Sequence, residues 1–266
     1  MSSHIIALLT DFGYTDPFVG MMKGVILGID PQARLIDLTH QIEPGDIVGG
    51  ALALKQSLAY FPPGTVFLGV VDPGVGSGRA PVLVESGERF LVGPDNGLFY
   101  PAVEGAEFSV WRLDNPVYHL PRVSSTFHGR DIFAPVSAHL SRGVPPKELG
   151  SSLPGLLRLE LPQPEREGNL LKGEVIQVDR FGNLLTNLTE ADLGGEKIKT
   201  IRVRGVEIAG LSSHYSQVPP GGLLALMSSF SRLELAANQG SAASILKAAR
   251  GSKLEVEFKN RSSLKK

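Results

Sequence analysis

Short apolar segments alternate with segments of helical periodicity through the first half of the chain, and this alternation limits the fold more than any other feature. Residues 5–9, 35–38 and 64–72 are continuously or nearly continuously hydrophobic, as expected of strands that are buried on both faces. Between them, residues 18–29 and 47–61 carry apolar side chains at helical spacing. The pattern predicts an α/β layer with a mostly parallel central sheet.

Aspartates stand where the first two helices are expected to begin. Asp16 precedes Pro17, which suits the first turn of a helix, and Asp46 precedes the second helical segment. We therefore expect both aspartates to act as helix caps.

Polar residues follow the expected strands at their carboxyl ends. They are Thr10-Asp11, Thr39-His40, Asp72 and Pro94-Asp95-Asn96. In open α/β sheets, ligands bind in the crevice outside these ends. Asp11 lies several residues before the first helix, so helix capping does not account for it and a ligand contact is expected.

The segment VVDPGVGSGR, residues 70–79, places three glycines within five residues. A phosphate-binding loop requires a helix directly after it and a G-x-x-x-x-G-K-S/T or G-x-G-x-x-G spacing. Here the glycines alternate, and the following residues predict a β-hairpin around Gly87. The turn is therefore expected to hold Asp72 and Arg79 on either side of a small space, either for a ligand or as a structural ion pair.

A second polar turn, SSTFHGRDIFAP, lies at residues 124–135 and opens a predicted helix. His128 is well placed to contact a ligand, and Asp131 is a possible helix cap. His128 and Asp131 could suggest a metal pair, but the H-E-x-x-H pattern is absent. No metal is expected.

The proline-rich segment at about residues 161–169 predicts a linker between two domains, residues 1–162 and 170–266. The second region consists of short segments with period-2 alternation, as in a small β-barrel or sandwich. Ser241 is a possible cap of the one helix expected there. Two of its turns, residues 178–187 and 228–238, are unusually polar.

The overall composition excludes several classes of function. The net charge is −1, so neither nucleic acid nor an anionic membrane is an expected partner. Cysteine is absent, which rules out disulfides and thiolate chemistry. No apolar run approaches the ~20 residues of a membrane span. A cytoplasmic protein is expected.

Five motifs together resemble one family: LTDFG, VDPGVGSGR, GPDNG, STFHGRD and DRFGNLLTN. They are similar to motifs of the S-adenosylmethionine (SAM) hydrolases, also called SAM hydroxide adenosyltransferases, which are related to the SAM-dependent fluorinating and chlorinating enzymes. The motifs occur in family order over nearly the whole chain. The resemblance implies an α/β domain, a smaller C-terminal β-barrel, and a homotrimer with sites between subunits.

The resemblance also assigns roles to particular residues. It implies a catalytic set of Asp72, Arg79 and His128, with Asp11 and Asp72 near the ribose or the nucleophile. The substrate contacts that it implies in the C-terminal domain are Asp179, Phe181, Asn183, Ser229, Phe230, Glu234 and Ala237. Ser231 departs from the pattern, because relatives are expected to have glycine there.

The implied reaction is attack of water or hydroxide on C5′ of SAM, which yields adenosine and methionine without a cofactor. The halogenating relatives have tyrosine where this chain has His128, which favours hydrolysis. Either Asp72 or His128 could accept the proton. The alternatives are a halide-dependent adenosyl transferase and a non-catalytic module that binds SAM or adenosine.

Overall fold

The computed structural model describes residues 4–259, and the chain forms two compact units, residues 1–159 and 160–266. Each unit has its own hydrophobic core. They are described separately below.

The first unit is built on a seven-stranded sheet in the order β2-β1-β3-β5-β4-β6-β7. Strands β2, β1, β3 and β5 are parallel, and β4, β6 and β7 extend the sheet in antiparallel fashion. The expectation of an α/β unit with a mostly parallel sheet is therefore confirmed. The bounds are β1 Ile5–Thr10, β2 Arg34–Thr39, β3 Val66–Val70, β4 Pro81–Ser86, β5 Arg89–Pro94, β6 Ser109–Arg112 and β7 Ser151–Leu153.

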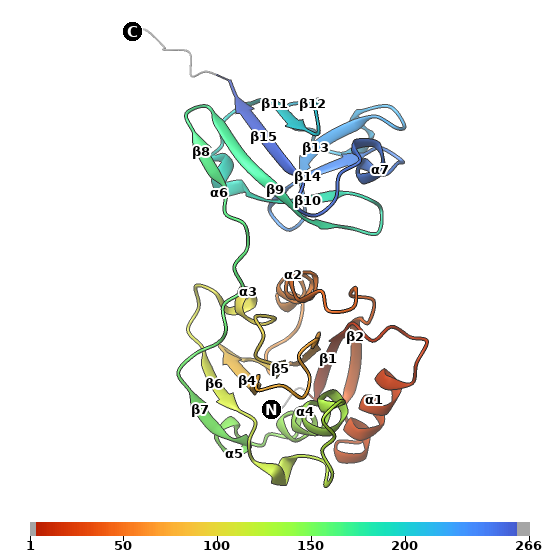
Figure 1. Cartoon of the computed structure of the whole chain (residues 1–266), viewed down its shortest axis with the longest axis vertical. Helices are drawn as coiled ribbons and strands as arrows, with labels where there is room; N and C mark the ends of the chain where they lie inside the picture. The colour runs from red at the N-terminus through yellow and green to blue at the C-terminus, as the bar shows by residue number, and fades with distance from the viewer. Residues whose placement is uncertain (1–3, 260–266) are drawn as a thin grey trace. The chain divides into compact units, whose positions relative to one another are not determined.

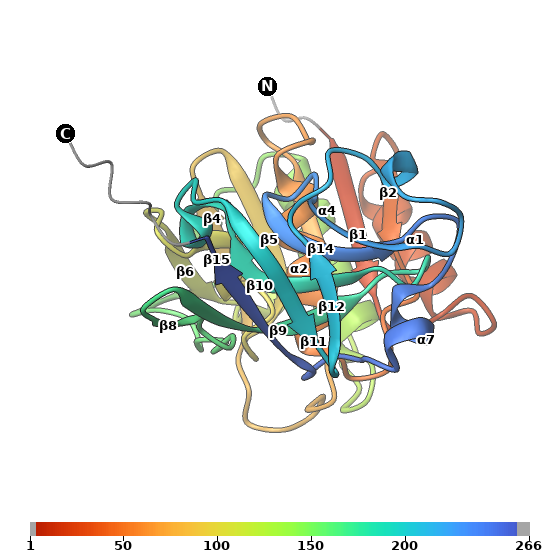
Figure 2. The same cartoon turned by 90° about the horizontal axis from the view of Figure 1, so that it is seen from above.

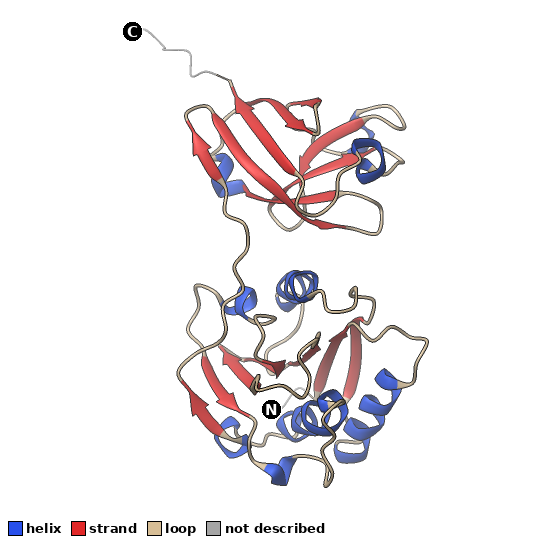
Figure 3. Ribbon diagram, viewed as in Figure 1, coloured by secondary structure: helices blue, strands red, loops and turns tan. Residues whose placement is uncertain are grey.

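Helices cover both faces of this sheet (Figures 1 and 3). Ile6 and Leu8 pack in a core with α1 (Phe18–Ile29) and α4 (Ala134–Ser141). Ala7 and Leu9, which point the other way, pack with α2 (Ile47–Leu58) and α3 (Tyr100–Val103). Because both faces are covered, the parallel strands are apolar throughout. The described part of this unit also contains η1 (Pro116–Tyr118), the π-turn η2 (Gly129–Phe133) and α5 (Pro146–Leu149).

The two expected aspartate caps have different outcomes. Asp46 is confirmed, because its side chain accepts a hydrogen bond from Gly49 N at the start of α2. The expectation for Asp16 is wrong: Pro17 occupies the N-cap position of α1, and no side chain caps that end. Pro17 therefore lies one position earlier than the first-turn position expected from the sequence.

The segment after the glycine turn is a β-hairpin, as expected, and not a helix. Strand β4 begins at Pro81, and Gly87 takes a left-handed φ of 58° in the turn between β4 and β5. The helix N-terminus that a phosphate loop requires is therefore missing after Gly78.

The second unit is an antiparallel sheet in the order β12-β11-β15-β9-β10-β14-β13, with β8 paired to β9. Strands β12, β11, β15 and β9 lie side by side (Figure 2). The end strands β12 and β13 contact each other, so the sheet nearly closes into the expected barrel. The bounds are β8 Glu165–Glu167, β9 Leu170–Val178, β10 Leu184–Thr189, β11 Ile198–Val203, β12 Val206–Ala209, β13 Leu223–Met227, β14 Arg232–Ala237 and β15 Lys253–Phe258.

Short helices also occur in the second unit. Ser241 caps α7 (Ala242–Leu246) by accepting from Ser244 N, as expected. A second helix, α6 (Glu190–Leu193), was not expected from the sequence. It is followed along the chain by η3 (Tyr215–Gln217). None of the helices within residues 4–259 is long and apolar enough to cross a membrane.

Candidate active site

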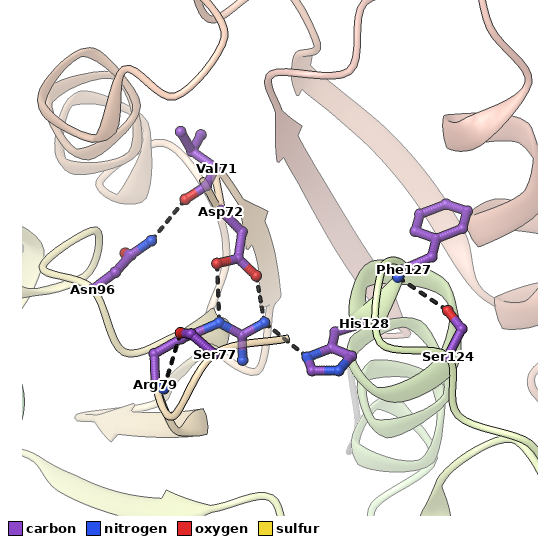
Figure 4. A network of polar contacts seen from close by, with 8 residues as sticks. All are labelled: Val71, Asp72, Ser77, Arg79, Asn96, Ser124, Phe127 and His128. Carbon is purple, nitrogen blue, oxygen red and sulfur yellow. Dashed lines mark hydrogen bonds and ion pairs between the residues drawn. The ribbon is translucent and has the colours of Figure 1, made fainter. Parts of the chain in front are cut away.

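Asp72 and Arg79 form a two-pronged ion pair across the glycine turn (Figure 4). Arg79 Nε donates to Asp72 Oδ1 at 2.9 Å, and Arg79 Nη2 donates to Asp72 Oδ2. Only 8% of the Arg79 side chain and 5% of the Asp72 side chain are exposed. The expected ion pair therefore exists, and its buried, charge-assisted geometry fixes the guanidinium plane.

His128, which follows Arg79 by 49 residues in the chain, also contacts this pair (Figure 4). Arg79 Nη2 lies 2.8 Å from His128 Nδ1. Since a guanidinium only donates, Nδ1 is the acceptor and the remaining proton of a neutral ring is on Nε2. Burial lowers the pKa of His128, and the charge of Arg79 lowers it further against the opposing effect of Asp72 and Asp131. The histidine is therefore held neutral near pH 7.

The glycine turn approaches the His128 turn closely. Gly76 has a φ of +78°, and a Cβ there would collide with the carbonyl oxygen of Ser125. Ser124 Oγ in turn accepts from Phe127 N at 3.1 Å (Figure 4). Glycine at position 76 thus allows two turns far apart in sequence to meet at Arg79.

One nitrogen of Arg79 is left unused by these contacts. Within the part of the chain that the structure describes, the buried atom Nη1 has no hydrogen-bond partner. The Arg79 guanidinium carbon also lies 5.4 Å from the centre of the Phe133 ring. A buried donor without a partner is unfavourable, so this atom is available for an oxygen or an anion.

Asp131 does not cap a helix, contrary to the expectation from the sequence. It lies inside η2, is fully buried, and pairs with Arg130 Nε at 2.6 Å. Its Oδ2 also accepts from Ser124 N at 2.9 Å. Burial acts to raise the pKa of Asp131, but the bonds from Arg130 and Ser124 outweigh it and lower that pKa. Asp131 therefore anchors the His128 turn.

Asp11 and Asn96 hold other loops at the same strand ends. Asp11 Oδ2 accepts from Gly45 N at 2.8 Å, which ties the end of β1 to the loop before α2. Asn96 Nδ2 donates to Val71 O at 2.8 Å, next to Asp72 (Figure 4). The polar strand ends singled out in the sequence are thus cross-linked loops at one edge of the sheet.

The second unit contains a pocket of about 510 Å³. The residues that line it are Phe181, Asn183, Tyr215, Ala237, Gln239 and Gly240. Phe181 is 76% exposed, whereas Asn183 and Ala237 are buried. An exposed aromatic ring beside a buried amide suits the face and the edge of a planar heterocycle.

Asp179 shapes the turn that carries Phe181 and Asn183. Its Oδ1 accepts from Phe181 N at 2.9 Å and from Asn183 N at 2.8 Å. Its Oδ2 accepts from Asn183 Nδ2 at 3.0 Å. Gly182 has a left-handed φ of 82°, and a side chain there would collide with Ser241. Asp179 thus fixes the conformation of the turn that carries Phe181 and Asn183.

Glu234 is buried on β14 and accepts from the hydroxyl of Tyr215 at 2.8 Å. Burial raises the pKa of Glu234, and nearby Asp179 adds to this effect. Burial and Glu234 together raise the pKa of Tyr215 to about 12. The sequence carries no signal for Tyr215, because it lies between the segment SSH and two prolines, outside any strand pattern.

Ser229 and Phe230 lie on the exposed turn between β13 and β14, and neither lines the pocket. Ser231, the position where glycine was expected, has a φ of +54° in the left-handed region. The departure noted in the sequence therefore coincides with a strained backbone position.

A metal site finds no support among residues 4–259. No group of three or more His, Asp or Glu side chains there is arranged to hold a metal ion. The chemistry of the first site is that of one guanidinium, one carboxylate and one imidazole.

Sequence profiles of known families cover both units. The SAM hydroxide adenosyltransferase N-terminal domain matches residues 6–150, and the C-terminal domain of the same family matches residues 173–255. A protein of Thermotoga maritima, solved as an uncharacterized conserved protein, superposes with a TM-score of 0.88 at 35% identity. That match covers 94% of this chain and 99% of the other.

Named relatives agree with these profiles. An (R)-S-adenosyl-L-methionine hydrolase of Salinispora arenicola is 40% identical, covering 94% of this chain and 97% of that protein. One of Thermus thermophilus is 39% identical, covering 89% and 93%. A fluorinase of an Actinoplanes species is 29% identical, covering 71% and 73%. This chain therefore belongs to the SAM hydroxide adenosyltransferase family.

Proposed function

We propose that the protein hydrolyses S-adenosyl-L-methionine to adenosine and L-methionine. The observation that carries the proposal is the unused Nη1 of Arg79, buried beside Asp72 and His128, in a member of this family. Relatives named as hydrolases, which share up to 40% of their residues with the chain, support it.

The reaction is a nucleophilic substitution at C5′. A water oxygen forms a bond to C5′ while the C5′–S bond breaks. The electron pair of the C5′–S bond stays on sulfur and neutralises the sulfonium. The leaving group is a neutral thioether, so no general acid is required. The site must supply an aligned, partly desolvated oxygen and an acceptor for its proton.

Arg79 stays protonated and acts through its charge. Its Nη1 is free to donate to the water or to the hydroxide that forms from it. Asp72 keeps Nε and Nη2 of Arg79 engaged, which leaves Nη1 with a fixed direction.

Asp72 and His128 are the two candidate proton acceptors. The carboxylate oxygens of Asp72 retain lone pairs after binding Arg79. His128 Nδ1 already accepts from Arg79, so it gains a proton only if that contact opens. Its lowered pKa keeps it unprotonated and ready at neutral pH.

Substrate recognition is assigned to residues of both units. Asp11 and Asp72 would contact the ribose or the nucleophile, and Phe181 and Asn183 the adenine or ribose. The methionine portion would meet Ser229, Phe230 and Glu234, with the backbone near Ala237 and Asp179 supporting the turn. In this proposal, residues 1–162 form the catalytic domain and residues 170–266 the domain of adenine and methionine contacts.

The remaining parts of the proposal come from the resemblance and the composition. We propose a cytoplasmic homotrimer with sites between subunits, without a cofactor and without nucleic-acid or membrane partners. Light scattering of the purified protein would test the trimer, since a monomer at micromolar concentration contradicts it.

The decisive experiment incubates the purified protein with SAM, with and without chloride, and separates the products by chromatography. Adenosine and methionine in equal amounts, independent of chloride, are the expected result. A 5′-chloro product would instead establish a halide-dependent adenosyl transferase, which the fluorinase relatives make the second candidate. Unchanged SAM that nevertheless binds, as measured by calorimetry, would establish a non-catalytic binding module.

A further inference from the structure

A fully buried histidine lies at the end of β2 and is not used by the proposed reaction. The His40 side chain is 0% exposed. The hydroxyl of Thr10, also fully buried, lies 2.8 Å from His40 Nδ1. On the other side of the ring, His40 Nε2 lies 3.0 Å from Asp37 Oδ1, without the alignment of a full hydrogen bond.

The charges around this ring fix its orientation. Lys23 Nζ on α1 donates to the other oxygen of Asp37 at 2.7 Å. Burial acts to raise the pKa of Asp37, but the contacts with Lys23 and His40 outweigh it and lower that pKa. Because Asp37 is an acceptor, Nε2 carries a proton, and Nδ1 is left to meet the Thr10 hydroxyl.

Both Thr10 and His40 also hold the backbone that follows β1. Thr10 Oγ1 accepts from Phe12 N at 3.2 Å. The carbonyl oxygen of His40 accepts from Gly13 N at 2.7 Å. The ring of Tyr14 stands perpendicular to the His40 ring, with 5.2 Å between centres.

Asp11 is the one residue of this turn that the proposed function uses, and it lies between these fixed points. Residues 10, 12 and 13 are each bonded within the network, and Asp11 itself reaches across to Gly45 N at 2.8 Å. The contacts of the neighbouring residues and the bond to Gly45 N therefore fix the orientation of the Asp11 carboxylate.

We propose that His40 and Thr10 are positioning residues, which hold the Asp11 carboxylate at the carboxyl end of β1 for its contact with the hydroxyls of a ribose. This inference rests on the proposed function, in which Asp11 meets the nucleoside. In this proposal neither His40 nor Thr10 contacts the substrate. Their effect reaches it through the turn formed by residues 10–13.

The test replaces the Thr10 hydroxyl and keeps its shape. Thr10→Val removes the contacts to His40 and to Phe12 N at nearly constant volume, whereas Thr10→Ser keeps the hydroxyl. We expect Thr10→Val to raise KM for SAM about tenfold, the size of a lost buried hydrogen bond, with little change in kcat. Thr10→Ser restores the KM of the unaltered protein.

A matched control lies in the same unit and at a distance in the fold. Ser141 is also buried and donates to Asp30 Oδ2 at 2.8 Å. Ser141→Ala should lower the melting temperature and leave KM unchanged. If Thr10→Val behaves like Ser141→Ala, with lower stability and unaltered KM, the positioning role is overturned.

A second measurement reads the position of Asp11 directly. The Gly45 amide is bonded to the Asp11 carboxylate, so its hydrogen exchange reports whether that carboxylate stays in place. We expect faster exchange at Gly45 in Thr10→Val and in His40→Leu, and no change in Ser141→Ala. Unchanged exchange in both variants would contradict the inference.

The same experiments separate this inference from the proposed function. If the unaltered protein does not cleave SAM, the hydrolase proposal fails, and the affinity for adenosine replaces KM as the readout. A weaker affinity for adenosine in Thr10→Val would then still support the positioning role. If the unaltered protein binds no adenosine, both proposals fail together.

Discussion

The Arg79 cluster of the first unit and the Phe181 pocket of the second unit are built in opposite ways. Asp72, Arg79 and His128 are joined by charge-assisted hydrogen bonds, with Asp72 and Arg79 largely buried and His128 partly buried. The Phe181 pocket is open, with an exposed ring at its edge and left-handed backbone at Gln239. Under the proposed function, the groups that carry out the chemistry are held in place by one another without a ligand, whereas the groups that recognise the ligand remain exposed to it.

The largest expected effect comes from breaking the Arg79 cluster at His128. His128→Ala should lower kcat by roughly 10²–10⁴-fold, the usual contribution of a positioned acid–base group, and change KM far less. Steady-state kinetics with SAM measures both constants. Equal losses in kcat and KM would contradict a catalytic role.

His128→Gln refines this result, because an amide oxygen can accept from Arg79 but cannot take up the proton. A variant that keeps most of its turnover would assign His128 to holding Arg79 and leave proton acceptance to Asp72. A loss as large as in His128→Ala would assign proton acceptance to His128.

Gly76→Ala tests whether the cluster depends on its turn. The added Cβ would collide with Ser125, and alanine at a φ of +78° adds strain of about 1–2 kcal/mol. We expect a lower melting temperature and at least a tenfold loss of kcat, about 1.4 kcal/mol in the barrier. Gly78→Ala in the same turn meets no atom within 4 Å and should change neither.

Phe181→Ala tests the pocket side of the comparison. Stacking of a base on an aromatic ring is worth about 1–3 kcal/mol, so KM for SAM should rise about 5- to 150-fold while kcat and stability stay constant. Tyr60→Ala removes a ring of similar exposure in the first unit, 74% against 76%. An equal rise of KM in both variants would show that the effect is not specific to the pocket.

The pH dependence of stability reports on three partly buried histidines. Burial is the first cause that lowers the pKa of His128, His119 and His139. Below the unfolded value of about 6.5, the unfolded chain binds protons that the folded chain does not. The free energy of unfolding should therefore fall as the pH falls below that value.

Urea unfolding at several pH values measures this slope. His128→Gln should reduce the slope, since one of the three histidines no longer titrates. An identical slope in His128→Gln would show that the folded state does not hold His128 neutral.

The smallest expected effect is at Ser231. Glycine relieves left-handed strain of about 1–2 kcal/mol but adds about 0.5–1 kcal/mol of unfolded-state entropy. Ser231→Gly should thus stabilise the protein by about 0.5 kcal/mol without a change in KM, as measured by urea unfolding and kinetics. Lower stability would show that the Ser231 side chain makes a favourable contact.

The sequence predicted the alternation of strands and helices and the juxtaposition of Asp72 and Arg79 across the glycine turn, and the family resemblance grouped His128 with that pair. Residue patterns alone did not indicate that Arg79 contacts His128, because 49 residues separate them and no local pattern encodes a contact made by folding. For Asp72 and Arg79 the spacing was informative, because a sequence separation of seven residues leaves few arrangements for the two side chains.

The errors have local causes. Asp16 was expected to cap α1, but Pro17 takes the N-cap position itself. Asp131 was expected at a helix start and instead lies within the π-turn, where Arg130 and Ser124 bind it. Helix α6 carries a detectable signal, the capping box of Thr189 and Asp192, which a search for apolar periodicity does not register.

Strand β14 is flanked by two residues with left-handed backbone conformations, Ser231 directly before it and Gln239 two residues after it. Of these two residues, only Gln239 lines the Phe181 pocket. Laboratory evolution for heat resistance alone should accept glycine at either position, because both relax a costly backbone conformation. Evolution that also demands turnover at low SAM concentration should accept it at position 231 and reject it at position 239. The residues found at positions 231 and 239 of an evolved variant would then show whether it was selected for stability alone or also for turnover.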